Sequence, residues 1–171
     1  MAGGQNTWRE FLTLPNILKE FNPDLIGYSL GDSLSHQKGS QFNVADGGAM
    51  SRDMPFQAKL LVRRMKRDKR VDIKNHWKVV TIHIGSNDFC LDMCYQDEDQ
   101  VPENHRNDLQ RSLDYLQDNL PRTLVNLVTT TRESAGGHHP EPIPSPRKVS
   151  CFPLPYVEGV PGTSASLPHQ L

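Results

Sequence analysis

The sequence predicts an α/β protein whose core is a three-layer parallel sheet, incomplete in this chain. The first observation is the apolar run Lys78–Ile84, which is typical of a buried parallel strand. The second is the leucine stripe of Asn107–Leu120, which predicts a helix directly before another strand, Thr123–Thr129. Strands that alternate with helices favour βαβ units, with ligands near the carboxyl ends of the strands.

The segments before this core predict shorter elements. Thr13 before a proline predicts a cap for a short helix that ends near Phe21. Asp24–Leu30 has β character, so we expect a strand there. A longer helix begins at Asp53 and carries an apolar face, whereas its basic residues are expected on a solvated face. The polar segment Asp92–His105 is expected to form a loop.

The chain divides by composition into two parts. Residues 1–133 are expected to form a partial α/β domain, because they offer three or four strands where such a sheet usually has about five. Residues 134–171 hold eight of the 13 prolines and contain a Gly-Gly pair at positions 136 and 137. We expect this second part to be a disordered tail.

Composition excludes several classes of protein. The net charge of −1 does not fit a globally basic nucleic-acid binder, and no nucleic-acid partner is expected. The basic run Arg63–Arg70 is interpreted as a solvated helix end. The alternatives are a nuclear-localisation or nucleic-acid patch, a polyanion site, and a contact with anionic membrane headgroups. No signal peptide or membrane span is visible, which leaves localisation open. Three cysteines do not predict a metal site.

Three short motifs could supply ester chemistry. Gly31–Leu34 reads GDSL, Asn43–Ala49 reads NVADGGA, and Gly85–Asp88 reads GSND at the end of the best strand. In acyl transfer, negative charge develops on the carbonyl oxygen, and each preorganised N–H donor aimed at it stabilises the transition state by roughly 3–4 kcal/mol. The alternative interpretation of each motif is ordinary turn chemistry.

Together these motifs resemble the GDSL, or SGNH, hydrolases, and most closely the membrane-associated phospholipase B family. The similarity runs from Leu12 to Val128 and includes TLPNIL, RDMP and WKVVT. It implies a cofactor- and metal-independent serine esterase of phospholipids, lysophospholipids or other lipid esters. It also implies Ser33 as nucleophile and Gly48 and Asn87 as oxyanion-hole donors. Family members are cell-surface proteins, and for Cys90 the resemblance favours a disulfide with Cys94. The alternative is a pair of buried thiols, which the absence of a visible signal peptide favours.

Two departures from the family pattern predict impaired hydrolysis. The family's nucleophile block opens the domain, whereas Ser33 follows TLPNIL and falls where the family has a variable loop. The nucleophile block is therefore expected upstream of Met1. The family's base comes from an Asp-x-x-His block, and no histidine here has an aspartate three residues before it. The alternative function is a non-catalytic remnant that binds lipid or a partner.

Overall fold

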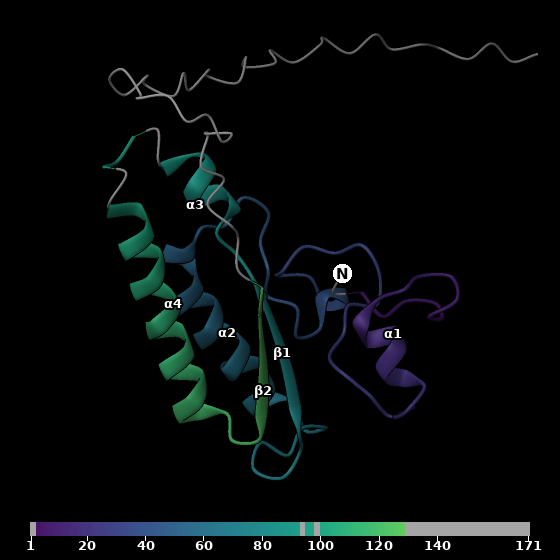
Figure 1. The fold of residues 1–171 in the computed structure, drawn as a ribbon. Helices are drawn as coiled ribbons and strands as arrows, with labels where there is room; N and C mark the ends of the chain where they lie inside the picture. Colours follow the sequence, from purple (N-terminus) through teal and green to yellow (C-terminus); the bar gives the residue numbers. More distant parts are fainter. Residues whose placement is uncertain (1–2, 93–94, 98–99, 129–171) are drawn as a thin grey trace, which may run out of the picture. The chain divides into compact units, whose positions relative to one another are not determined.

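The sheet of this protein consists of two parallel strands. The computed structural model describes residues 3–92, 95–97 and 100–128, and these belong to one of the two compact units into which the chain divides. Strands β1 (Lys78–His83) and β2 (Thr123–Val128) pair in parallel along their whole length (Figure 1). The two strands predicted at these positions are confirmed, as is their parallel arrangement.

Helices α2 (Met54–Arg67) and α4 (Gln100–Asn119) cover one face of this sheet (Figure 1). The predicted apolar face of α2 is confirmed, because its regularly spaced apolar residues are buried. The main core consists of ten buried residues, which come from the two helices, from β1 and from the turn after α4. They are Met54, Ala58, Leu61, Val62, Met65, Val80, Ile82, Leu109, Leu116 and Leu120.

The prediction of three layers is not met within the described residues, where the sheet has one covered face. Burial alternates along β1, so that Val80 and Ile82 are buried whereas Val79 and Thr81 are exposed. A parallel strand covered on both faces would be buried at every position. The apolar run therefore indicated a strand correctly, but it did not show how many faces are covered.

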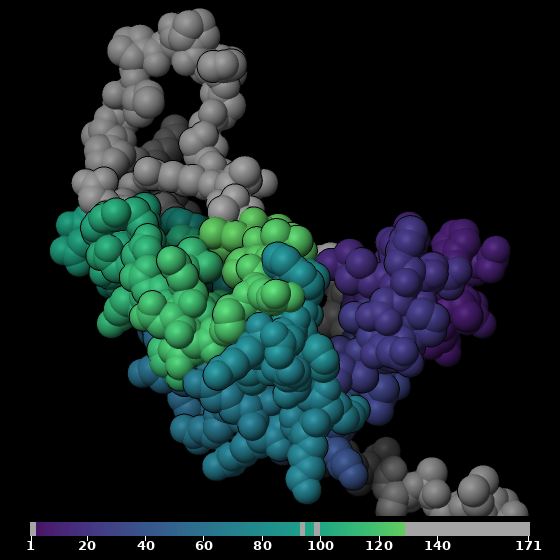
Figure 2. All heavy atoms as spheres, turned by 90° about the horizontal axis from the view of Figure 1, so that it is seen from below, coloured from purple at the N-terminus to yellow at the C-terminus, as the bar shows by residue number. Residues whose placement is uncertain are grey.

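The turn that follows α4 is tied to the segment that leads into β1, and the two lie side by side when the molecule is seen from below (Figure 2). The Lys78 N–H donates to the carbonyl of Arg122 at 2.9 Å, and Arg122 Nη1 donates to the carbonyl of Asn75 at 3.2 Å. These bonds fix the register at the start of the two strands.

The predicted strand Asp24–Leu30 is wrong. Within it, the structure shows one isolated bridge, between Ser29 and Gly3. Gly27 has φ +97°, which interrupts an extended backbone. Its carbonyl accepts from Phe42 N at 3.0 Å, so this segment bonds to a loop instead of a sheet ladder.

Helix α1 (Leu14–Lys19) confirms the short helix predicted near the N-terminus. Thr13 caps it as expected, since its side chain accepts from Asn16 N and donates to the carbonyl of Gly3 at 2.8 Å. Asn16 is 1% exposed, and its amide donates to two carbonyls of residues 5–11. These bonds hold the N-terminal segment against α1.

Helix α4 begins at Gln100, seven residues before the predicted Asn107, so the loop prediction for Asp92–His105 is wrong from Gln100 onward. Pro102 is compatible with a first helical turn, because the N–H it lacks has no partner within the helix there. Val101 is 3% exposed and provides the apolar anchor of the added turn. Among the described helices, none is long and apolar enough to cross a bilayer.

Arg64 is an exception to the predicted solvated face of α2. Its guanidinium donates to the Ser35 carbonyl, to the Gln41 carbonyl at 3.0 Å and to Ser40 Oγ at 3.2 Å. It therefore anchors the loop that precedes η1 (Lys38–Ser40) and the residues that follow it to the helix.

We predict that Arg64→Ala destabilises the protein by about 1–3 kcal/mol, because it leaves acceptors in this loop without a donor. Arg63→Ala, which removes the exposed neighbouring arginine, is the matched control, and its free energy of unfolding is expected to change by less than about 0.5 kcal/mol. Urea unfolding followed by circular dichroism measures both. Equal losses in the two variants would contradict the anchoring role of Arg64.

The predicted tail, residues 134–171, lies outside the described residues, as do Cys94 and the last five residues of the predicted domain.

Candidate oxyanion-hole site

The structure brings together two of the three predicted site residues, Gly48 and Asn87. Asn87 lies in α3 (Ser86–Cys90), a short helix that starts directly after β1 and that the sequence did not predict. Its Nδ2 donates to the carbonyl of Ala49 at 2.9 Å. The Asn87 side chain of the GSND motif therefore contacts Ala49, the residue that follows Gly48. The motif also lies at the carboxyl end of a strand, as predicted.

Gly48 occupies a turn that requires glycine. Its φ is +79°, in the left-handed region where other residues are strained. The residue is exposed, and among the described residues no acceptor is bonded to its N–H. Asn87 Nδ2 carries two hydrogens, of which the bond to Ala49 uses one. Within the described residues, the site thus holds two N–H groups without a protein acceptor, the Gly48 N–H and the second N–H of Asn87.

A buried aspartate holds these two segments in place. Asp88 is 4% exposed and Ser51 is 2% exposed. The Ser51 N–H donates to both carboxylate oxygens at 3.0 Å, and Ser51 Oγ donates to the same carboxylate. Ser51 begins η2 (Ser51–Asp53), just after Gly48 and Ala49, so this contact fixes the turn relative to α3.

His105 lies beside the same carboxylate, and its Nδ1 is 4.0 Å from Asp88 Oδ1. Its ring packs against Phe89, with 5.1 Å between ring centroids. Ser51, Asp88 and His105 do not form a catalytic triad, because a triad needs histidine between serine and aspartate. Here Asp88 itself accepts the Ser51 hydroxyl. No local sequence pattern indicates this cluster, because its members lie on three separate segments.

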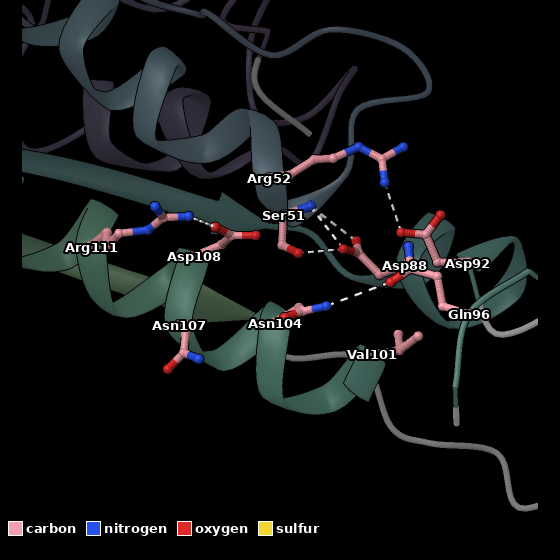
Figure 3. A pocket seen from close by; sticks show the side chains of 10 residues that line it. All are labelled: Ser51, Arg52, Asp88, Asp92, Gln96, Val101, Asn104, Asn107, Asp108 and Arg111. Atoms are coloured by element: carbon pink, nitrogen blue, oxygen red, sulfur yellow. Dashed lines mark hydrogen bonds and ion pairs between the residues drawn. The ribbon is translucent and has the colours of Figure 1, made fainter. Parts of the chain in front are cut away.

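A polar cavity of about 520 Å³ adjoins this cluster (Figure 3). Its charged side chains are largely paired: Arg52 Nη1 lies 2.7 Å from Asp92 Oδ2, and Arg111 contacts Asp108. The cavity is lined by Ser51, Arg52, Asp88, Asp92, Gln96, Val101, Asn104, Asn107, Asp108 and Arg111.

Ser33 does not join the site through any hydrogen bond described by the structure. Its Oγ donates to the carbonyl of Gly31 at 3.2 Å, within its own turn. In the described part of the chain, no hydrogen bond connects Ser33 to a histidine, to Gly48 or to Asn87. The GDSL letters lie in a bend of a loop, where Ser33 Oγ is bonded to the residue two positions before it.

Cys90 ends α3 and is exposed, whereas its proposed disulfide partner Cys94 lies outside the described residues. Among the described residues, no group of three or more His, Cys, Asp or Glu side chains could hold a metal ion.

Comparison with known proteins places these motifs in a family. The chain is 42% identical to mouse membrane-associated phospholipase B1 over 137 residues, which is 80% of the chain and 9% of the mouse protein. It is 38% identical to the rat protein of the same name over 155 residues and 39% identical to the human one over 128 residues. These alignments cover 88% and 75% of the chain, and 10% and 9% of the two relatives.

The chain thus spans about a tenth of the length of these relatives. No solved structure matches it. The family model described as GDSL-like Lipase/Acylhydrolase matches residues 1–156, nearly the whole chain. The protein therefore belongs to the GDSL-like lipase/acylhydrolase family.

Proposed function

We propose that this chain carries the oxyanion-hole part of a carboxylic-ester hydrolase that acts on phospholipids, lysophospholipids or related lipid esters. The observation that carries the proposal is the bond from Asn87 Nδ2 to the Ala49 carbonyl, which places an amide donor beside the Gly48 turn. The relatives' name, phospholipase B1, and the family description support lipid esters as the substrate class. Peripheral contact with an anionic membrane surface is part of the same proposal.

In this mechanism, Gly48 N–H and the second N–H of Asn87 donate to the oxygen of the ester carbonyl. Negative charge develops on that oxygen as the tetrahedral intermediate forms, so donors already in place stabilise the transition state more than the substrate. The bond to Ala49 fixes the orientation of the Asn87 amide, and the Asp88–Ser51 contact fixes the distance between the two donors.

We also propose that hydrolysis by this chain is impaired at the nucleophile. Ser33 Oγ is bonded within its own turn, and no Asp-x-x-His block occurs in the sequence. A serine hydroxyl without a positioned base is a poor nucleophile at neutral pH. An oxyanion hole and substrate binding alone retain about 10³–10⁴-fold catalysis over water in hydrolases that lack a triad member. Slow, water-dependent hydrolysis is therefore expected.

Ester hydrolysis by the wild-type protein and the Ser33→Ala variant tests this proposal. A short-chain p-nitrophenyl ester and a lysophospholipid are the substrates, and circular dichroism confirms that both proteins are folded. We expect slow turnover of the activated ester at the same rate in both proteins. Loss of turnover in Ser33→Ala would instead identify Ser33 as the working nucleophile.

The second candidate function is non-catalytic binding of lipid. The hydrogen bond from Ser33 Oγ to Gly31 favours it, since the hydroxyl is held by its own turn. A folded wild-type protein that sediments with lysophospholipid micelles but hydrolyses neither ester would support this second function over the first.

A further inference from the structure

Helix α2 carries a surface that the proposed site does not use. A surface hollow of about 330 Å³ lies between α2 and α4. We call it the basic hollow, and its lining residues are Lys59, Val62, Arg63, Lys66, Arg67 and Tyr115. Four of these six residues are cations and none is a carboxylate.

The basic hollow differs in charge from the polar cavity beside Asp88. In that cavity, each arginine contacts an aspartate, whereas no ion pair among the described residues involves Arg63 or Arg67. Lys59 Nζ lies 6.0 Å from the centroid of the Tyr115 ring, and Lys66 Nζ donates to Asn119 Oδ1 at 3.1 Å. Nearby acidic residues of α4, Asp114 and Asp118, are exposed but do not line the hollow.

Two other basic residues of the same run are already neutralised or anchored. Arg70 forms an ion pair with Asp68 at 2.6 Å, and its hydrogen bonds lower the pKa of that carboxyl to about 2. Arg64 holds the preceding loop. Three of the six basic residues of this run, Arg63, Lys66 and Arg67, therefore line the basic hollow, and Lys69 is a further exposed cation of the run that lies outside it.

An exposed aromatic side chain extends this surface. Phe56 is 67% exposed and precedes Lys59, Arg63 and Arg67 at steps of three, four and four residues, so all four lie along one stripe of α2. The opposite side of the helix, with Ala58, is in the core. Cations beside an exposed aromatic ring are typical of surfaces that bind anionic headgroups and insert an apolar side chain between lipids.

We infer that the basic hollow, together with Phe56, binds the phosphate headgroups of an anionic lipid membrane. The cations attract the lipid phosphates and the phenyl ring enters the interface. This inference specifies which residues make the membrane contact named in the proposed function. It rests on the proposed function only in taking a lipid membrane as the source of the phosphate groups. Adsorption to vesicles is measured without ester hydrolysis, so failure of one proposal is distinguishable from failure of the other.

Co-sedimentation of the full chain with vesicles tests the inference. One set contains phosphatidylcholine mixed with phosphatidylserine, and the other contains phosphatidylcholine alone. We expect binding to the mixed vesicles only, weakened by added salt. In the Arg63→Glu/Arg67→Glu variant, the loss is expected to exceed about 25-fold, since each basic residue near such a surface contributes about fivefold. Equal binding to both vesicle sets would overturn the inference.

A matched variant controls for net charge. Lys38→Glu/Lys74→Glu makes the same change of charge at exposed residues outside the stripe, and its binding is expected to stay within about threefold of wild type. A loss equal to that of the Arg63/Arg67 variant would show that net charge alone controls adsorption, and it would overturn the assignment to the hollow.

Phe56→Ser distinguishes a membrane from a soluble polyanion. We expect it to weaken vesicle binding and to leave binding to heparin unchanged, because only a membrane offers an apolar phase for the ring. The opposite result has two parts: Phe56→Ser binds vesicles as well as the wild type, and the wild type binds heparin strongly whereas the Arg63/Arg67 variant does not. This result would assign the hollow to a soluble polyanion and overturn the membrane inference.

Discussion

Replacement of Asn87 by alanine is expected to lower the slow ester hydrolysis of this protein by about 100-fold or more. The variant removes the amide donor that lies beside the Gly48 turn, where its Nδ2 contacts the Ala49 carbonyl at 2.9 Å. Loss of one oxyanion-hole donor affects the transition state more than the bound ester, so kcat is expected to fall while KM changes little. Initial rates with a p-nitrophenyl ester at several concentrations measure both constants.

Asn126→Ala is the matched control for this experiment. Asn126 lies on β2, paired with Thr81, and it is placed in neither the oxyanion site nor the basic hollow. The same side chain is removed there, so its hydrolysis rate is expected to equal that of the wild type. If Asn87→Ala and Asn126→Ala hydrolysed the ester at the same rate, the oxyanion role of Asn87 would be wrong.

Replacement of Asp88 by alanine is expected to destabilise the fold by about 3–5 kcal/mol. The carboxylate accepts from the backbone N–H and the hydroxyl of Ser51, and both residues are almost fully buried. Without it, two buried donors lose an ionised acceptor, and each such loss costs roughly 1–3 kcal/mol. Chemical denaturation at neutral pH measures the free energy of unfolding.

Two further variants separate this buried contact from a general loss of charge. Asp88→Asn retains one acceptor oxygen and is expected to show an intermediate loss of stability. Asp92→Ala removes a carboxylate that pairs with the exposed side chain of Arg52, and its cost is expected below about 1 kcal/mol. A cost for Asp88→Ala as small as that for Asp92→Ala would contradict the bracing role of Asp88.

Local patterns predicted the parts of the fold that depend on neighbouring residues. The apolar run at Lys78–His83, the leucine stripe of α4 and the threonine cap of α1 were all recognisable, because burial and capping leave periodic or positional signals. The predicted strand Asp24–Leu30 failed because a strand needs a partner, and this segment bonds to a loop instead.

Contacts between distant segments could not be predicted in this way. The Ser51–Asp88 bond joins the GSND motif to a serine that lies just after NVADGGA, and no local pattern indicates that the serine and the aspartate face each other. The basic run predicts a solvated face for Arg64 and its neighbours, because the loop acceptors that Arg64 binds lie more than twenty positions away in the sequence. The placement of Asn87 beside Gly48 was implied by family resemblance, and the structure supplies the contact that joins their segments.

Covalent labelling of the folded full chain with a fluorophosphonate, followed by peptide mass spectrometry, tests whether the serine at position 33 is activated. We propose that this chain supplies an oxyanion site without an activated Ser33. This proposal predicts no adduct on Ser33 under conditions where an unrelated serine hydrolase is labelled completely. Stoichiometric labelling of Ser33 would contradict it, because only an activated hydroxyl reacts at that rate.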